Sequence, residues 1–308
     1  MADKKKSIRT ILLQDLRRNK HVYIIILPVF IYYFVFQYLP MYGALIAFKD
    51  FRPSLGVWGS PWVGLKNFKD FFSSYYFVRL LKNTLALSIY SIVFGFPAPI
   101  ILALLLNELR VLWFKKIVQT ITYIPHFISI VIICGIIVNF VKTDGIISLV
   151  VKQLSGYDGN LLMDPKYFRT IYVASGIWQS IGWGSIIYLA TLAGINYELY
   201  EAARIDGAGR WKQTLYITLP SLLPTIMILL ILQMGSLMNV GFEKVMLLYN
   251  PGIYDTADVI STFVYRQGIL SAQYSFSSAV GLFNSVINCA LVILANQLSK
   301  RMTENSLW

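Results

Sequence analysis

The stretch Glu201-Ala202-Ala203-Arg204-Ile205-Asp206-Gly207, followed after nine residues by Ile217-Thr218-Leu219-Pro220, decides the organisation of this chain. It lies between two long apolar segments, so we expect a polar loop on one face of a membrane. The Glu-Ala-Ala start favours a helix, which Gly207 and Gly209 can end with a positive φ. Pro220 suits the first turn of the next helix, where no backbone hydrogen bond is lost. The stretch predicts a short helix held between two spans, with a carboxylate and small side chains that suit docking of a partner.

The composition indicates a membrane protein. Apolar residues make up 56% of the 308 residues and charged residues only 14%, whereas soluble domains carry about 25% charge. The net charge of +12 could indicate nucleic acid, but the basic residues cluster beside apolar runs and without stacking aromatic residues. This pattern is typical of membrane topology and of attraction to anionic lipid, so nucleic-acid binding is not expected.

Six apolar runs are long enough to cross a bilayer, which takes about 20 residues. They cover residues 22–46, 83–106, 117–141, 170–195, 219–241 and 276–299. The sequence therefore predicts an all-α polytopic membrane protein with six transmembrane helices. A basic segment (1–21) precedes this single domain (22–299), whose loop 196–220 holds the stretch quoted above, and a short tail (300–308) follows it.

Basic residues set the expected orientation of the spans. One set of alternating segments holds Lys4, Lys5, Lys6, Arg9, Arg17, Arg18, Lys20, Arg110, Lys115, Lys116, Arg204, Arg210, Lys212, Lys300 and Arg301. The other loops hold fewer basic residues in more sequence. Because basic loops stay on the cytoplasmic side, we expect both termini and loop 196–220 to be cytoplasmic.

The N-terminal part allows a competing interpretation as a secretory signal peptide. The run from Val22 to Phe48 is too long for one, lacks an A-x-A-like cleavage site and is followed by further spans, so we expect it to remain as a span. Cys134 and Cys289 both fall inside predicted spans, and no disulfide between them is expected.

The first outer loop, residues 49–82, is rich in aromatic residues interleaved with charges. Such residues settle at the membrane–water boundary, so an interfacial anchor is favoured. Contact with an external binding protein is the alternative.

Polar residues recur on one face of each of the last three spans. Because polar groups inside a bilayer are costly unless they face protein or water, we expect these faces, plotted at 100° per residue, to line a shared hydrated cavity. Amides and hydroxyls beside tryptophan rings suit recognition of a sugar. The candidate substrate-pathway residues are Ser175, Trp178, Gln179, Trp183, Gln233, Ser236, Asn239, Glu243, Asn284 and Asn288.

Other interpretations of these polar residues stay open. The amides could simply join helices to one another, and Glu243 could cap a loop or pair with Lys244. His126, which follows Pro125, is better explained as a structural residue at a kink than as a proton carrier. Four prolines inside predicted spans are expected to bend them: Pro28, Pro97, Pro99 and Pro224.

The sequence carries no motif for catalysis. It has no G-x-x-x-x-G-K-[ST] phosphate loop, no G-x-S-x-G turn and no His/Cys/Glu cluster with metal-ligand spacing. We therefore expect no enzymatic activity, no metal and no cofactor in this chain. Energy for transport must then come from another protein.

The spacing of Glu-Ala-Ala, Gly and Ile-x-Leu-Pro in the stretch that opens this section resembles the EAA loop of permeases in binding-protein-dependent ABC importers. Nearly the whole chain is similar to a type I ABC importer permease of the carbohydrate-uptake group, and within it to oligosaccharide and polysaccharide permeases of Gram-positive bacteria. The residues that carry the closer match are Pro40-Met41-Tyr42-Gly43, Ala47-Phe48-Lys49-Asp50-Phe51, Trp62-Val63-Gly64-Leu65, Tyr123-Ile124-Pro125-His126-Phe127-Ile128-Ser129 and Ala257-Asp258-Val259-Ile260-Ser261-Thr262.

The resemblance implies a bacterial cell-membrane complex: a second homologous permease subunit, two copies of an ATPase that binds ATP and Mg, and an extracellular solute-binding lipoprotein. It also implies a cytoplasmic coupling helix, with Glu201 in the groove of the ATPase. The implied coupling residues are Glu201, Ala202, Ala203, Asp206, Gly207, Gly209, Leu219 and Pro220.

Two other classes of membrane protein remain as alternatives. An ion-coupled secondary transporter or channel would need an ionisable residue within the membrane, and only Glu243 comes close. A structural scaffold is weaker still. Among ABC importers, an anionic substrate would favour buried Arg or Lys, which the predicted cavity faces lack. A neutral or weakly charged sugar is therefore favoured, with a uronate left open.

Overall fold

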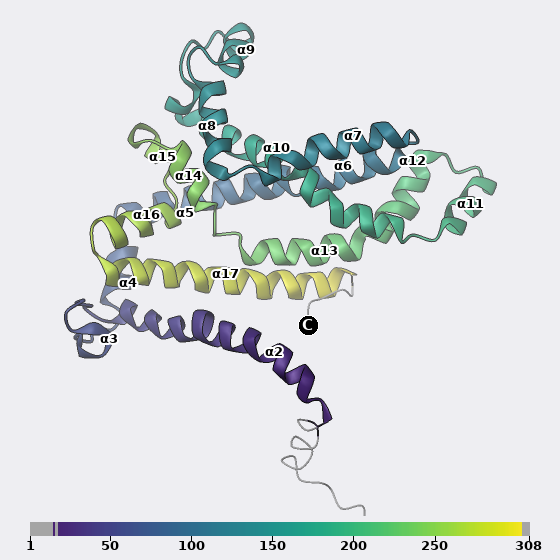
Figure 1. Ribbon diagram of the computed structural model, residues 1–308. Helices are drawn as coiled ribbons and strands as arrows, with labels where there is room; N and C mark the ends of the chain where they lie inside the picture. The colour runs from purple at the N-terminus through teal and green to yellow at the C-terminus, as the bar shows by residue number, and fades with distance from the viewer. Residues whose placement is uncertain (1–14, 16–17, 304–308) are drawn as a thin grey trace, which may run out of the picture.

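The computed structural model of this chain describes residue 15 and residues 18–303. Most of segment 1–21 and residues 304–308 of the tail lie outside that description, and so do the predictions made for them. The described part is helical apart from connectors, with one isolated β-bridge between Lys49 and Trp62. Long helices lie side by side, with α11 and α12 at one end of the bundle and α14 to α16 at the other (Figure 1). The predicted all-α class is confirmed.

The long helical passes have these bounds. The first comprises α2 (Lys20–Tyr33), η1 (Phe34–Tyr38) and η2 (Leu39–Phe48), and the second α5 (Tyr76–Tyr90), η3 (Ser91–Gly95) and α6 (Pro97–Glu108). The third is interrupted, with α7 (Leu112–Tyr123), η4 (Ile124–Phe127) and α8 (Ile130–Val141). The last three are α10 (Pro165–Ala193), α12 (Arg210–Gln213) with η6 (Thr214–Thr218) and α13 (Leu219–Gly235), and α17 (Tyr274–Thr303).

Shorter helices connect these passes at the two ends of the bundle. One of these connecting helices is α11 (Tyr197–Ile205). The others are α3 (Gly56–Gly59), α4 (Lys66–Phe72), α9 (Ile146–Ser155), η5 (Leu161–Met163), α14 (Phe242–Leu248), η7 (Pro251–Ile253), α15 (Tyr254–Ala257), α16 (Ile260–Tyr265) and η8 (Arg266–Leu270).

Two predicted spans have wrong boundaries. The third, 117–141, is not one helix, because Ile128 is extended and Ser129 caps the start of α8. The fifth ends at Gly235 rather than at residue 241. Five segments of the described chain are long and apolar enough to span a membrane: Lys20–Phe48, Tyr76–Glu108, Ile130–Ser155, Arg210–Gly235 and Tyr274–Arg301. The 29 residues of α10 make a further pass that is less apolar.

Three passes contain a π-helical turn that ends two residues before a proline. These turns are η1 before Pro40, η3 before Pro97 and η6 before Pro220. A proline has no N–H, and its ring clashes with the carbonyl four residues earlier. A wider turn moves that carbonyl aside, so the helix continues instead of breaking. Around Pro28 and Pro224, α2 and α13 remain α-helical.

The helix α10 packs between α6 and α7 through two glycines. A Cβ atom at Gly182 would overlap the carbonyl oxygen of Thr122 in α7. A Cβ atom at Gly184 would lie 2.9 Å from Cγ of Pro99 in α6. Small residues of this kind let helix backbones approach closely in membranes. The position of α10 is therefore fixed on two sides.

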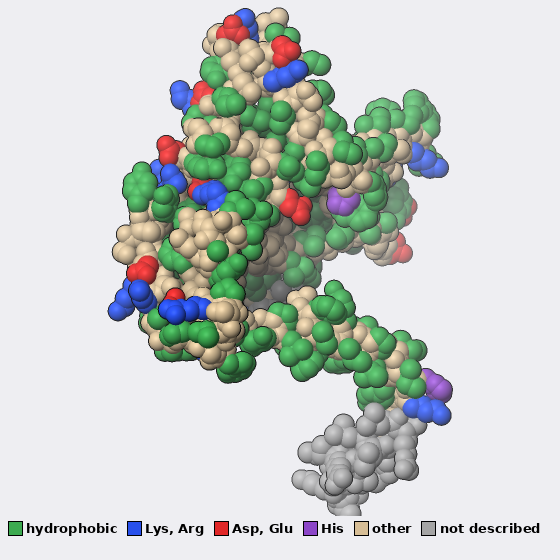
Figure 2. Space-filling view, turned by 60° about the vertical axis from the view of Figure 1, so that its left-hand side comes forward, with side chains coloured by type: hydrophobic (Ala, Val, Ile, Leu, Met, Phe, Trp, Pro, Cys, Tyr) green, Lys and Arg blue, Asp and Glu red, His purple; other side chains and the backbone are tan. Residues whose placement is uncertain are grey.

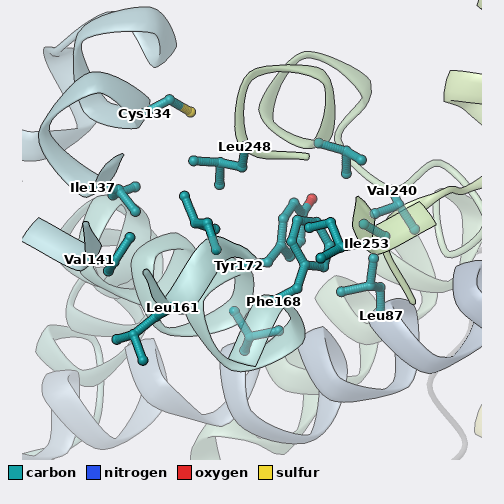
Figure 3. Packing of buried hydrophobic residues seen from close by; sticks show 14 of the residues in the cluster. Leu87, Cys134, Ile137, Val141, Leu161, Phe168, Tyr172, Val240, Leu248 and Ile253 are labelled. Carbon is teal, nitrogen blue, oxygen red and sulfur yellow. The ribbon is translucent and has the colours of Figure 1, made fainter. Parts of the chain in front are cut away.

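A buried apolar cluster joins α10 to α8 and to the connectors that follow α13 (Figure 3). Cys134 and Ile137 of α8 lie toward Phe168 and Tyr172 of α10, with Leu248 of α14 beside them. Cys134 is buried and Cys289 is exposed, and both thiols are free.

The first pass packs on the bundle only through its second half. The segment η2 contacts α17, whereas α2 has no buried residue and diverges from α17 toward its N-terminal end (Figure 1). The side chains on the surface of α2 are mainly hydrophobic (Figure 2). So much exposed apolar surface is stable only against lipid or another subunit.

The close approach at Gly182 predicts that Gly182→Ala destabilises the bundle. The added methyl group must push α7 and α10 apart, and such overpacking costs about 1–3 kcal/mol. The midpoint of thermal unfolding in detergent should therefore fall. Gly135→Ala in α8 is the matched control, because a Cβ atom there meets nothing within 4 Å. Equal midpoints for the two variants would contradict this packing.

Candidate functional site

The predicted short helix is present as α11, and local sequence signals set both of its ends. Asn196 caps its start, where Oδ1 accepts a hydrogen bond of 3.0 Å from the backbone N–H of Glu198. Gly207 follows its end with φ of 74°, in the left-handed region that favours glycine. The N–H of Ala208 then donates to the carbonyl of Ala203 at 2.8 Å. The glycine turn is the one that the sequence predicts, whereas the helix starts at Tyr197, four residues before the predicted start at Glu201.

Most of the surface of α11 is exposed in the part of the chain that the structure describes. Glu201, Ala202, Asp206, Gly207 and Gly209 are exposed, and Ala203 is half-buried. Figure 1 shows α11 projecting from the end of the bundle.

Two large apolar side chains beside α11 were missed by the sequence reasoning. Ile205 and Trp211 are each 87% exposed. Large apolar residues inside a polar loop were the available signal for them. Exposed apolar groups next to a carboxylate form a surface suited to a protein partner.

Polar contacts link α11 to the fifth pass, and the start of α12 to the second pass. The hydroxyl groups of Tyr200 and Thr218 lie 2.9 Å apart, which links α11 to the start of α13. Arg210 lies 3.7 Å from the carboxylate of Glu108 at the end of α6. A cleft of about 850 Å³ separates α11 from the ends of α6 and α10. Leu219 and Pro220 form the first turn of α13. A displacement of α11 would therefore reach the fifth pass through Tyr200, and the start of that pass contacts α6 through Arg210.

A cavity of about 540 Å³ lies between the second pass, α10 and α13. Trp183 and Gln233 line it, as does His126 from η4. The rings of His126 and Trp183 are stacked, with centroids 4.5 Å apart and planes 3° from parallel. His126 thus lies at the interruption of the third pass, as the kink interpretation expects, but it also faces a cavity. The sequence reasoning did not place it there, because nothing local connects residues 126 and 183.

The other predicted pathway residues lie in different places. Asn284 lines a second cavity, of about 520 Å³, between η8, α16 and α17. Ser175 and Trp178 line a third, apolar cavity of about 380 Å³ against α8. Gln179 is half-buried on α10, and Ser236 and Glu243 are exposed. The predicted faces are distributed over three cavities in this chain.

Three asparagines join α17 to the segment that follows α13. Asn239 Oδ1 accepts hydrogen bonds from Nδ2 of Asn284 at 2.8 Å and from Nδ2 of Asn288 at 3.2 Å. Asn288 Oδ1 accepts from the N–H of Met238 at 2.9 Å. Because α13 ends at Gly235, Asn239 does not continue its polar face, and the predicted span 219–241 is wrong at this end. These amides connect segments, as the alternative interpretation proposed.

Lys244 is buried and turns toward α10 rather than toward Glu243. Its Nζ donates to the carbonyl of Tyr172 at 2.9 Å and lies 4.9 Å from the centre of the Tyr172 ring. Burial lowers the pKa of the Lys244 ammonium to about 8. Among the residues that the structure describes, no group of His, Cys, Asp and Glu could hold a metal ion.

The passes, the cavities between them and the exposed helix α11 define a multi-pass membrane permease. Residues 95–304 match the family described as binding-protein-dependent transport system inner membrane component. This chain belongs to that family. The match begins at the end of η3 and leaves the first pass outside it.

Two proteins of Bacillus subtilis are similar along nearly the whole chain. Protein LplB is 46% identical, over 95% of this chain and 92% of its own length. The polygalacturonan/rhamnogalacturonan transport system permease protein YteP is 44% identical, over 99% of this chain and 95% of its own length.

Two crystal structures share the fold. One is of a bacterial ABC transporter involved in the import of the acidic polysaccharide alginate, with a TM-score of 0.87 at 43% identity over 95% of this chain and 99% of that chain. The other is of a bacterial alginate ABC transporter in complex with an alginate pentasaccharide-bound periplasmic protein, with a TM-score of 0.88 at 42% identity over 96% and 99%. The predicted ABC importer permease fold is confirmed.

Proposed function

We propose that this chain is one transmembrane subunit of an ATP-driven importer that takes up an oligo- or polysaccharide delivered by an external solute-binding protein. The observation that carries the proposal is the exposed helix α11, which presents Glu201 and Ile205 and is linked to the fifth pass by Tyr200 and Thr218. Membership of the family described above supports the same function.

The ATPase in this proposal is a separate protein that binds ATP and Mg, present in two copies. The sequence contains no phosphate loop of its own. A groove on the ATPase would receive α11, with Glu201 paired to a basic group and Ile205 and Trp211 packed on apolar surface. When ATP binding brings the two ATPase subunits together, α11 would move with them. The contact of Tyr200 with Thr218 would carry that movement to the fifth pass, and the contact of Arg210 with Glu108 would carry it on to α6.

The substrate in this proposal is a polymer of sugars, taken through a channel shared with a second permease subunit. Stacked rings at His126 and Trp183 offer a flat apolar face for a sugar, and Gln233 offers amide hydrogen bonds. The names of YteP and of the alginate importer favour an acidic sugar over the neutral one that the sequence favoured. No Arg or Lys is among the residues that line the cavities of about 540 and 520 Å³, so amides or the second subunit would meet a uronate carboxylate.

An ion-coupled transporter has less support. That class needs an ionisable group inside the membrane, and Glu243 is exposed on α14, outside the fifth pass.

We place the protein in a bacterial cell membrane with α11 and both termini in the cytoplasm. The α15 end is then external.

This orientation predicts opposite labelling of two introduced cysteines. In a background with Cys134→Ala and Cys289→Ala, Ser155→Cys at the end of α9 should react with an impermeant maleimide added to intact cells. Glu198→Cys on α11 should react only after the membrane is opened. Both native positions are exposed in the structure, so burial does not confound the result. Labelling of Glu198→Cys in intact cells would reverse the orientation.

The proposed coupling predicts defects from Glu201→Lys and Gly207→Val. The first reverses the charge offered to the ATPase, and the second places a β-branched residue at φ of 74°, which strains the turn. Both variants should reach the membrane, yet ATP hydrolysis should no longer respond to binding protein and sugar. Glu198→Lys on the same helix is the control. Normal stimulation in both variants would exclude α11 as the coupling element.

The stacked cavity predicts weaker transport in Trp183→Ala and Gln233→Leu. Loss of a sugar-stacking ring, or of a hydrogen bond, would each cost about 0.5–1.5 kcal/mol. We therefore expect KM for uptake to rise about two- to tenfold while assembly with the ATPase is unchanged. Trp113→Ala, an exposed tryptophan on α7 that lines none of these cavities, serves as the control. Uptake by the cavity variants that matches the control would assign the pathway elsewhere.

A further inference from the structure

A basic pocket of about 460 Å³ opens at the α15 end of the bundle, apart from the cavities between the passes. Arg79 and Lys82 of α5 and Arg169 of α10 line it, together with Asn83 and Asp255. None of its lining residues also lines the cavity beside Trp183 or the one beside Asn284. Charged side chains gather at this end of the molecule (Figure 2).

The buried carboxylate beneath the pocket is already neutralised by another arginine. Asp258 is fully buried, and its two oxygens accept hydrogen bonds of 2.8 and 2.7 Å from the guanidinium of Arg266. Thr262 Oγ1 donates a further bond of 2.8 Å. Arg79 lies 3.6 Å from the same carboxylate, so it shares a charge that Arg266 already holds in a bidentate pair.

The second carboxylate near Arg79 is a weak partner. Asp255 lies 3.3 Å from Arg79 Nη1, but its side chain is 83% exposed. Exposed pairs of this kind contribute about 0–1 kcal/mol. Among the residues that the structure describes, the Nε–H of Arg79 has no hydrogen-bond partner.

Arg169 and Lys82 have no carboxylate partner within the described part of the chain. Arg169 donates to Asn83 Oδ1 at 3.0 Å, and its buried Nε–H finds no partner in the described ranges. Asn83 in turn is held by the carbonyls of Asp255 and Asp258, at 2.9 and 3.1 Å. The guanidinium of Arg169 is therefore positioned by a fixed amide but not neutralised.

The local charge balance favours an anion in this pocket. Four cations, Arg79, Lys82, Arg169 and Arg266, stand against two carboxylates, Asp255 and Asp258, which leaves an excess of two positive charges. Partly buried cations without counterions are costly, and guanidinium groups match the two oxygens of a carboxylate.

We propose that this pocket receives an acidic side chain of the external solute-binding protein and so anchors that protein on the permease. The inference rests on the proposed function, which places the α15 end outside the cell. The exposed Lys82 at the rim would attract the acidic partner, and Arg169 and Arg79 would hold its carboxylate. A protein side chain is favoured over the transported sugar, because the pocket shares no lining residue with the cavities between the passes.

The experiment uses the whole importer in nanodiscs of zwitterionic lipid together with its own solute-binding protein. Lys82→Glu reverses a rim charge that forms no ion pair with any residue that the structure describes, and Arg169→Gln keeps an amide donor for Asn83 but removes the charge. Lys66→Glu on α4 is the matched control, an exposed lysine outside the pocket. Unchanged thermal midpoints establish that all three variants fold.

We expect Lys82→Glu to raise the Kd of the binding protein at least tenfold and Arg169→Gln about fivefold, with Lys66→Glu within twofold of wild type. The wild-type Kd should rise with salt, and less so in Lys82→Glu. If one acidic surface residue of the binding protein is replaced by lysine, the new lysine can pair with the glutamate of Lys82→Glu. This substitution should restore affinity for Lys82→Glu and for no other variant. Equal Kd values for Lys82→Glu and Lys66→Glu would overturn the proposal.

Two further arms separate other anions from this partner. A defect that appears only in nanodiscs with anionic lipid would assign the pocket to a lipid phosphate and overturn the proposal. A defect that appears only when the binding protein carries a uronate glycan would assign it to the sugar, with the same consequence. If the wild-type importer neither binds the protein nor responds to it in ATP hydrolysis, the proposed function itself fails, whatever the variants do.

Discussion

The close approach of α10 to α6 and α7 at Gly182 and Gly184 is the contact on which the rest of the structure depends. Neither glycine leaves room for a side chain, so α10 cannot shift sideways or turn about its axis without separating its neighbours. That fixed axis sets Trp183 against His126 in the cavity of about 540 Å³. It also sets Arg169 at one end, beside Asn83 of α5. Sites at different depths thus share one rigid helix.

Local signals made α11 predictable from the sequence. The helix-forming residues Glu201 to Ala203 and the turn at Gly207 act within a few residues of each other, and the structure forms both. The cap at Asn196 is equally local, but the prediction did not use it. The interruption at Ile128 and Ser129 was missed because the residues around it stay apolar, so hydropathy alone sees one continuous run. For the same reason the predicted fifth span extends beyond Gly235, where the helix ends in the structure.

The arrangement of polar residues could be predicted only in part. Angular plots assume an unbroken helix, and that assumption failed where α13 ends and Asn239 bonds to α17 instead. Contacts between distant segments carry no sequence signal in a single chain. His126 meets Trp183, and Arg169 meets Asn83, only because the bundle brings separate passes together. No sequence motif therefore predicted the basic pocket, because its residues come from separate passes.

A rigid helix between two ends gives a physical basis for communication across the membrane. Arg169 lies in the first turns of α10, and Leu192 near its other end lines the cleft beside α11. If docking at one end and ATPase closure at the other each favour the same tilt of α10, each must strengthen the other by the same factor, because a coupling free energy is reciprocal. The two glycine contacts make such a tilt a movement of α6, α7 and α10 as one unit, since packed interfaces change between discrete arrangements rather than deform gradually. Substitutions that loosen Gly182 should then weaken the coupling between the ends before they weaken binding at either one.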